Sequence, residues 1–565
     1  MSGNLSEDKL VVDSSVDYLR RPPLRATTGT WKAAMFIILI EFSERLSYFG
    51  IATNLMIYMT KVLHQDMKVA AENVTYWVGV STVMPLFGGL VADAFMGRFA
   101  TVILSTGIYL MGLVLLAMTQ LLPGLKPTSA SPQLHETLFF VGIYLLSVGT
   151  GGHKPALESF GADQFDDGHA GERLQKMSFF NYWNCALCSG VILGVTVVVY
   201  LQERAGWGAA TVLLTSVMGV SLIVFLAGWK KYRYRPVRGS PLTPLVRVMV
   251  AAARKHHLKL PADANELYQD DEGKMRMVLC HTDKLRFLDK AAIMERGVEG
   301  AWRLATVSEV EGTKLVVSMV PIWVATLAFG ITATQVSTFF IKQGTTMDRR
   351  LGIHFILPPA SIFSLAAVAM IATVAVYDWV LEPCLRKRRK NAERGISILQ
   401  RIGIGMAFTV AAMVVASIVE RRRLHMTSPT MMSVFWLAPQ FALMGIGDGF
   451  ALVGLQEFFY EQVPDTMRSL GIGLYLSVIG AGSFLSNLVI KAADRVSSRG
   501  GHTGWFGKDL NRSRLDLFYC LLAGIGGANL CFYILVASRY SYKQTIKTVN
   551  DKFDEDVEVS TATAA

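Results

Sequence analysis

The chain has 565 residues, of which 52% are hydrophobic and only 18% are charged, whereas a soluble chain usually carries about 25% charge. The high apolar content excludes a mainly disordered chain, and six cysteines in this length exclude a disulfide-stapled secreted domain. The net charge of +11 would suggest nucleic-acid binding in a soluble protein, but here we expect the basic loops to face a lipid bilayer and not nucleic acid.

Twelve apolar segments are long enough to cross a bilayer, which takes about 20 helical residues. In the first half of the chain they cover 32–60, 74–96, 101–122, 136–156, 179–202 and 209–229. In the second half they cover 315–341, 356–381, 400–420, 431–460, 469–491 and 514–537. The pattern predicts an all-α integral membrane protein with twelve transmembrane helices in two six-helix bundles, the layout of the major facilitator superfamily.

The remaining segments complete a division of the chain into five parts. These are a tail (1–30), a first bundle (31–229), a basic linker (230–314) with an amphipathic helix near 243–258, a second bundle (315–538) and a second tail (539–565). Lys and Arg concentrate in the linker and in the run 386–390. Because such residues stay on the cytoplasmic side of a membrane, both termini and the linker are predicted to be cytoplasmic. The sequence selects neither the plasma membrane nor the vacuolar membrane, and it does not set the oligomeric state.

Two loops at corresponding places in the halves resemble each other. The loop after the second segment contains Asp93, Gly97 and Arg98, and the loop after the eighth contains Asp378 and Arg386. Each places an acid at a helix end and a base shortly beyond it. We interpret the first loop as a cytoplasmic gate motif that holds the two bundles together, with ordinary helix-end charge as the alternative.

The first segment carries charges at its centre, in the stretch EFSER. Glu41, Glu44 and Arg45 have the spacing of one helix face. Two carboxylates share one guanidinium, so one carboxylate lacks a full partner and is suited to bind a proton. The alternative is a structural ion-pair cluster, or a segment that begins later and leaves the acids at the membrane surface.

Each half contains one further charge at membrane depth. Lys154 lies near the end of the fourth segment, and Glu457 lies near the end of the tenth. A cation in one half and an anion in the other could pair in one state of a transporter and separate in another. Alternatively, Lys154 extends to the membrane surface.

Several motifs, in order and at their proper spacing from about residue 30 to 540, resemble the proton-coupled oligopeptide transporter family in its plant branch, the nitrate/peptide transporter family. They are EFSER (41–45), GTGGHKP with FGADQFDD (149–167), FFNYWNCALCSG (179–190), RFLDKAA (286–292) and EFFYEQVPDTMRSLG (457–471). Cys185 and Cys188 depart from the common residues of the third motif.

The resemblance implies a proton-driven symporter that works by alternating access on a small-molecule substrate, with protons as the coupling ion and no other cofactor. Glu41, Glu44 and Arg45 would couple protons, and Lys154 with Glu457 would form a gating or substrate-sensing salt bridge. A cavity between the halves would be lined by Tyr48, Trp323, Gln335, Phe339, Gln440 and Phe459.

Two departures from the family pattern leave the substrate open. Peptide-transporting members carry an acid in the seventh segment, but 322–340 contains none. Nitrate-transporting members carry a His there, and the matching position is Ala333. Nitrate, peptides, hormones and specialised metabolites all remain candidate substrates.

Two other functions are compatible with the sequence. A proton-independent facilitator or exporter, and a sensor built on a transporter scaffold, are the alternatives. The chain contains no G-x-S-x-G, H-E-x-x-H or phosphate-binding loop, and His256-His257 has no third ligand nearby, so neither an enzyme nor a metal site is expected. Arg98-Phe99-Ala100-Thr101 resembles a basophilic kinase motif, which makes Thr101 a candidate phosphosite and a kinase a candidate partner.

Overall fold

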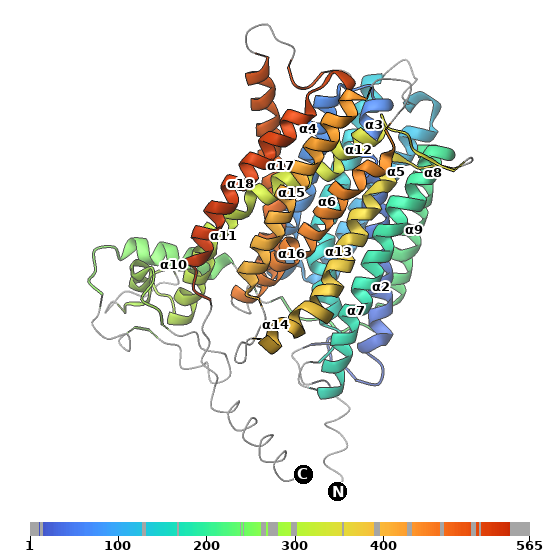
Figure 1. Ribbon diagram of the computed structural model, residues 1–565. Coiled ribbons are helices and arrows are strands. Elements are labelled where there is room, and N and C mark those ends of the chain that lie inside the picture. Colours follow the sequence, from blue (N-terminus) through green and yellow to red (C-terminus); the bar gives the residue numbers. More distant parts are fainter. Residues whose placement is uncertain are drawn as a thin grey trace.

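The computed structural model shows one bundle of long, roughly parallel helices with a smaller helical segment beside its base (Figure 1). It describes residues 11, 15–126, 132–166, 169–237, 239–240, 242–260, 267–268, 281–294, 302–352, 355–388, 396–426, 432–463, 468–498, 504–507 and 510–542. Eleven helical segments among these residues have the length and apolarity needed to cross a membrane. Helix α2 (Thr30–Ala52) brings the bundle to the twelve predicted helices, and it differs from the other eleven in carrying three buried charged residues near its centre, Glu41, Glu44 and Arg45.

The first half of the chain forms α2 and the helices that pack around it. They are α3 (Leu55–Lys61), α4 (Met67–Val91), α5 (Arg98–Leu121), α6 (Pro132–Ala162), α7 (Ala170–Leu193), α8 (Val199–Arg204) and α9 (Trp207–Ala227). Short irregular turns join some of them, namely η1 (Ala92–Met96), η2 (Pro123–Leu125) and η3 (Gly194–Val198). Helices α6, α7 and α9 all contact α2, which places α2 inside this half.

The second half repeats the arrangement. Its helices are α11 (Val307–Ala333), α12 (Phe339–Gly344), α13 (Ser364–Val376), α14 (Glu382–Arg388), α15 (Ile398–His425), α16 (Ala438–Gln462), α17 (Arg468–Ser497) and α18 (Leu515–Ser538). Its short turns are η6 (Thr334–Ser337), η7 (Pro359–Phe363), η8 (Tyr377–Leu381), η9 (Val434–Leu437) and η11 (Leu510–Arg512). A two-stranded antiparallel hairpin joins β1 (Arg350–Leu351) to β2 (Phe355–Ile356).

Several predicted segments are not single continuous α-helices. The prediction of one helix over 32–60 is wrong at Thr53–Asn54, where α2 ends before α3 begins, and 315–341 is interrupted by η6. The two loops that resemble each other in sequence both contain a π-helical turn, η1 around Asp93 and η8 around Asp378. The two loops are therefore similar in backbone geometry as well as in sequence.

The halves meet closely along α4 and α17. A Cβ atom added to Gly480 would lie 3.0 Å from the Gly79 carbonyl oxygen and 2.4 Å from a Val83 methyl group. Neither approach is compatible with a larger side chain, so glycine lets the two helices touch backbone to backbone.

The two ends of the bundle differ. The linker end carries α10 (Leu242–Arg254) and the turn η5 (Arg286–Ala292), and the hairpin end carries α3, α12 and the β-hairpin (Figure 1). Helix α10 buries Leu245, Val248 and Ala251, because apolar residues at this spacing share one helix face. Both α10 and η5 contact α11, which attaches the linker to the second half.

Candidate functional site: a buried charge cluster between helices α2 and α6

The three charged residues of α2 lie together, as their spacing predicts. Glu41, Glu44 and Arg45 are 3%, 0% and 5% exposed. Arg45 Nε lies 3.2 Å from Glu41 Oε1, and the guanidinium also forms an ion pair with Glu44. Glu41 Oε2 is inaccessible to solvent and accepts no hydrogen bond from the residues that the structure describes. One arginine thus serves two carboxylates, and Glu41 is the less satisfied of the two.

Helix α6 completes the cluster with residues four apart. Thr150, Lys154 and Glu158 fall on one helix face. The Thr150 hydroxyl donates a hydrogen bond of 2.9 Å to Glu44 Oε1, and Glu158 lies close enough to Glu41 and Arg45 for their charges to interact. The cluster therefore holds three acids and two bases.

Tyr48 connects the two bases. Lys154 Nζ lies 4.9 Å from the centre of the Tyr48 ring, and Arg45 Cζ lies 5.8 Å from it. Trp77 stacks on the same ring at 5.3 Å and 20°. An aromatic face stabilises a nearby cation in a water-poor site, so Tyr48 contributes to holding both charges. Of the predicted lining residues, Tyr48 is the one in contact with the charge cluster.

Three members of this region were missed in the sequence. Glu158 lies four residues after Lys154, within the motif at 149–167. This helical spacing alone predicts that Glu158 shares the face of Lys154. Tyr475 of α17 interacts electrostatically with Glu158, Glu41 and Arg45 from the opposite half, which only the tertiary structure shows. His153 is 0% exposed and bonds to Thr106 at 3.1 Å.

The predicted salt bridge between Lys154 and Glu457 is not formed. Glu457 Oε2 lies 3.2 Å from Arg401 Nη1, and Lys154 forms no ion pair with any residue that the structure describes. Arg401 is 6% exposed and lies 4.1 Å over the ring of Tyr377. Because α15 and α16 pack side by side, Arg401 reaches Glu457 within one half. The prediction paired Glu457 with Lys154 and so missed Arg401, although this residue lies at the start of the predicted segment 400–420.

Four of the predicted lining residues do not face a solvent-filled space. Gln335, Phe339, Gln440 and Phe459 are all 0% exposed. Gln335 bonds to Ser486 at 3.2 Å, and Phe339 packs against Phe506 and Phe518. Their positions are explained by helix packing, which the one-dimensional pattern does not reveal. Trp323 is partly buried and donates a hydrogen bond of 2.8 Å to Ser477.

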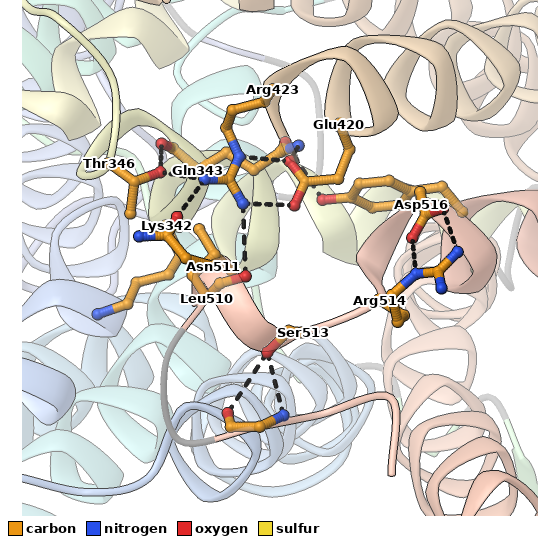
Figure 2. A network of polar contacts seen from close by, with 12 residues as sticks. Lys342, Gln343, Thr346, Glu420, Arg423, Leu510, Asn511, Ser513, Arg514 and Asp516 are labelled. Atoms are coloured by element: carbon orange, nitrogen blue, oxygen red, sulfur yellow. Dashed lines mark hydrogen bonds and ion pairs between the residues drawn. The ribbon is translucent and has the colours of Figure 1, made fainter. Parts of the chain in front are cut away.

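Gln440 belongs to a buried polar network at the hairpin end of the second half. Its amide donates to Gln343 Oε1 at 3.0 Å, and Gln343 Nε2 donates to Glu420 at 2.7 Å. Figure 2 shows Glu420 paired with Arg423, which also donates to Thr346 and Asn511. Each charge has a partner among the described residues, and the network joins α12, α15, α16 and the residues before α18.

The predicted gate motif acts within the first half. Arg98 lies 3.4 Å from Asp93 and 2.5 Å from Asp163, and Arg235 reaches Asp163 at 3.2 Å. Gly97 has a φ of +79°, which favours glycine at the start of α5. The prediction that this loop joins the two bundles is therefore wrong for this structure: it joins α4, α5, α6 and the segment after α9.

Thr101 is 4% exposed, and its hydroxyl donates to the Gly97 carbonyl at 2.9 Å. Helix α6 covers it, since a Cβ atom at Gly152 would lie 3.4 Å from its methyl group. A kinase could reach this hydroxyl only after the first turn of α5 separated from α6.

The linker contains a group of ligand-type side chains, His281, Asp289 and Glu311, with atoms within 4.8 Å of one another. Lys314 occupies the position of a cation among them. Its ammonium lies 2.7 Å from Asp289 and 2.8 Å from Glu311. Asp289 belongs to the RFLDKAA stretch, so the role of this motif here is to fasten η5 to the first turns of α11.

The two halves are joined by polar contacts at the hairpin end. Lys68 pairs with Asp494 at 2.5 Å, and Lys491 pairs with Glu72 at 3.5 Å. Lys342 donates to Thr60 at 2.9 Å. All three contacts cross from one half to the other, so this end is closed in the present structure.

Comparisons with known proteins agree with this architecture. The POT family profile, PTR2, matches residues 99–506. The chain belongs to the POT family. It is 55% identical to Protein NRT1/PTR FAMILY 5.6 and 53% identical to Protein NRT1/PTR FAMILY 5.7, both of Arabidopsis thaliana. The matches cover 95% and 99% of this chain, respectively, and 96% of each relative.

Solved structures of the family share the fold. An auto-inhibited POT family peptide transporter superimposes with a TM-score of 0.70 at 19% identity, covering 92% of this chain and 98% of that one. A POT family transporter in complex with 5-aminolevulinic acid superimposes with a TM-score of 0.62 at 12% identity, covering 89% and 95%. The predicted fold class and family are thus confirmed, and the chain is a multi-pass membrane transporter and not an enzyme.

Proposed function

We propose that this POT family member is a proton-coupled symporter that moves a small organic or anionic solute by alternating access. The observation that carries the proposal is the cluster around Arg45, in which Glu41, Glu44 and Glu158 outnumber Arg45 and Lys154. When these five groups are ionised, they carry one negative charge in excess. In a water-poor interior such an excess favours the binding of one proton.

The position of the cluster supports coupling to substrate. Tyr48 and Lys154 belong to the first half, whereas Tyr475 approaches from the second. A proton or substrate that changes the charge here would change the interaction between the halves. This is the differential interaction that a two-state transporter needs.

We further propose that the linker end faces the cytoplasm, in the plasma membrane or the vacuolar membrane. The basic linker and the run 386–390 support this orientation, because Lys and Arg near membrane helices remain on the cytoplasmic side. The contacts of Lys68, Lys491 and Lys342 would then close the outer side.

The proposal is tested by voltage clamp of oocytes that express the chain. Nitrate, dipeptides, glucosides and plant hormones are applied in acidic and in neutral medium. We expect one class to produce an inward current that grows in acidic medium. Uptake of labelled substrate that persists unchanged after the pH gradient is collapsed would contradict proton coupling and favour a facilitator.

The variant Glu44→Gln tests the cluster itself. Glutamine preserves the shape of the side chain and can still accept from Thr150, but it cannot bind a proton. We expect accumulation of labelled substrate against its gradient to fall by roughly tenfold or more, equivalent to about 1.4 kcal/mol of driving force, with normal surface expression. The matched control is Glu136→Gln, since Glu136 accepts a hydrogen bond from Gln65 at the hairpin end and should transport normally.

A further inference from the structure

A second acid lies at mid-membrane, in the half opposite the charge cluster. Asp448 is the eleventh residue of the 25-residue helix α16 (Ala438–Gln462). At 1.5 Å of rise per residue, this position is close to the centre of a membrane-crossing helix. An ionisable residue at this depth is costly and calls for a functional explanation.

Asp448 points toward the interior of the second half. The residues that share its helix face are buried. They are Phe441, Met444, Leu455 and Phe459, which lie at positions −7, −4, +7 and +11 relative to Asp448 and are all 0% exposed. Leu455 and Phe459 belong to an apolar cluster that also contains residues of α11, α15 and α17. The face that carries Asp448 is therefore directed into the packed interior of the second half, not at lipid.

The glycines on either side of Asp448 hold α16 against its other two neighbours. A Cβ atom at Gly447 would lie 2.7 Å from Thr409 of α15, and one at Gly449 would lie 3.0 Å from Thr373 of α13. Neither site has room for a larger side chain. The close packing on both flanks fixes the rotation of α16 and so keeps the carboxyl group facing inward.

No described residue pairs with the buried oxygen of this carboxyl group. Asp448 as a whole is partly exposed, but its Oδ1 atom is inaccessible to solvent and accepts no hydrogen bond from the described residues. The central parts of α11, α13 and α15 carry no acidic or basic residue, and the central part of α17 offers only Tyr475. Arg401 approaches the Gly449 carbonyl at 3.5 Å but is paired with Glu457.

We propose that Asp448 is a second proton-binding carboxylate, which takes up a proton when its face of α16 is enclosed and releases it when the interior of the second half opens to water. An unpartnered carboxylate costs several kcal/mol in an apolar interior, whereas its protonated form costs far less. Opening would hydrate the group and favour the ion. The proposal deepens the proton coupling proposed above by placing one proton site in each half.

Infrared difference spectroscopy tests this without a known substrate. The full-length chain in liposomes is taken from alkaline to acidic medium, and the carbonyl stretch of protonated carboxylic acids is recorded. We expect Asp448→Asn to lose one pH-dependent band and Asp448→Glu to keep a shifted band. Asp516→Asn is the matched control, because Asp516 is held by Arg514 at 3.0 Å and should leave every such band unchanged.

The outcomes separate this inference from the proposed function. If the spectrum of a folded, monodisperse Asp448→Asn protein is the same as that of the wild type, Asp448 is not the proton-binding group. If the variant loses a band that does not change with pH in the wild type, Asp448 does not exchange its proton. Transport by the wild type that is insensitive to pH would overturn the symport proposal instead. Even then, the infrared band that is lost in Asp448→Asn decides independently whether Asp448 binds a proton.

Discussion

At the scale of single residues, the charges inside the bundle differ in how completely they are neutralised. Glu457 has Arg401, and Glu420 has Arg423 together with Gln343. Glu41 shares Arg45 with Glu44, and Asp448 Oδ1 accepts no hydrogen bond from the described residues. Fully paired charges stabilise one arrangement of helices, whereas partly paired ones can respond to a proton or a substrate. The residues of the second kind are the ones we assign to transport.

A double-mutant cycle tests the partner of Glu457. We expect Arg401→Met and Glu457→Gln to be coupled by about 1–3 kcal/mol in the free energy of unfolding, because the two side chains form a charged hydrogen bond. Thermal unfolding of the purified variants provides the measurement. The matched cycle with Lys154→Met in place of Arg401→Met should show coupling near zero. If Glu457 is coupled to Lys154 and not to Arg401, the salt bridge predicted from the sequence, Lys154–Glu457, is the correct one.

The sequence contained the local part of this site but not the tertiary part. Glu41, Glu44 and Arg45 could be predicted because helical spacing alone brings them together. The Arg401–Glu457 pair could not, since it depends on which helix lies beside α16. Neither could the complete burial of Gln335 and Gln440, because a polar side chain bonded to a neighbouring helix looks the same in sequence as one that lines a cavity.

At the scale of elements, the helices were predictable and their interruptions were not. All twelve predicted segments correspond to helices, because about 20 apolar residues leave the backbone no other way to satisfy its hydrogen bonds in lipid. The breaks at Thr53–Asn54 and at η6 occur at short polar stretches without proline. In both places the chain is at the hairpin end, where α3 and α12 contact each other across the halves.

The attachment of the linker to α11 depends on one buried lysine. Lys314 is 3% exposed and neutralises Asp289 and Glu311 together. We expect Lys314→Met to destabilise the protein by about 3–5 kcal/mol, because it leaves two buried carboxylates without a cation. Limited proteolysis of the linker and thermal unfolding would reveal the loss. Arg247→Met is the control: the more exposed Arg247–Glu309 pair should contribute less than about 1 kcal/mol. Equal effects of the two variants would contradict a special role for Lys314.

At the scale of the whole molecule, the two halves are unevenly connected. Along α4 and α17 the connection is close backbone packing between Gly79 and Gly480, and at the hairpin end it is a set of polar contacts. Polar contacts at a water-exposed end are individually weak and can be exchanged for water. In the alternating access proposed above, the contact along α4 and α17 would be the pivot, and the polar contacts at the hairpin end would be the closure that opens.

A reversible cross-link across this closure tests whether it must open. We would replace Lys68 and Asp494 by cysteine, in a background from which the six native cysteines have been removed, and join them with a short reducible reagent. Because Lys68 and Asp494 belong to different halves, the link should abolish uptake of labelled substrate, and reduction should restore it.

Gln65 and Glu136 are also in contact at the hairpin end, at 2.7 Å, but both lie in the first half. The same link between cysteines at these two positions should leave uptake unchanged, since neither half deforms internally in a rocking movement. Undiminished transport through the Lys68→Cys/Asp494→Cys cross-link would show that the hairpin end stays closed during the cycle, and alternating access between the halves would have to be abandoned for this chain.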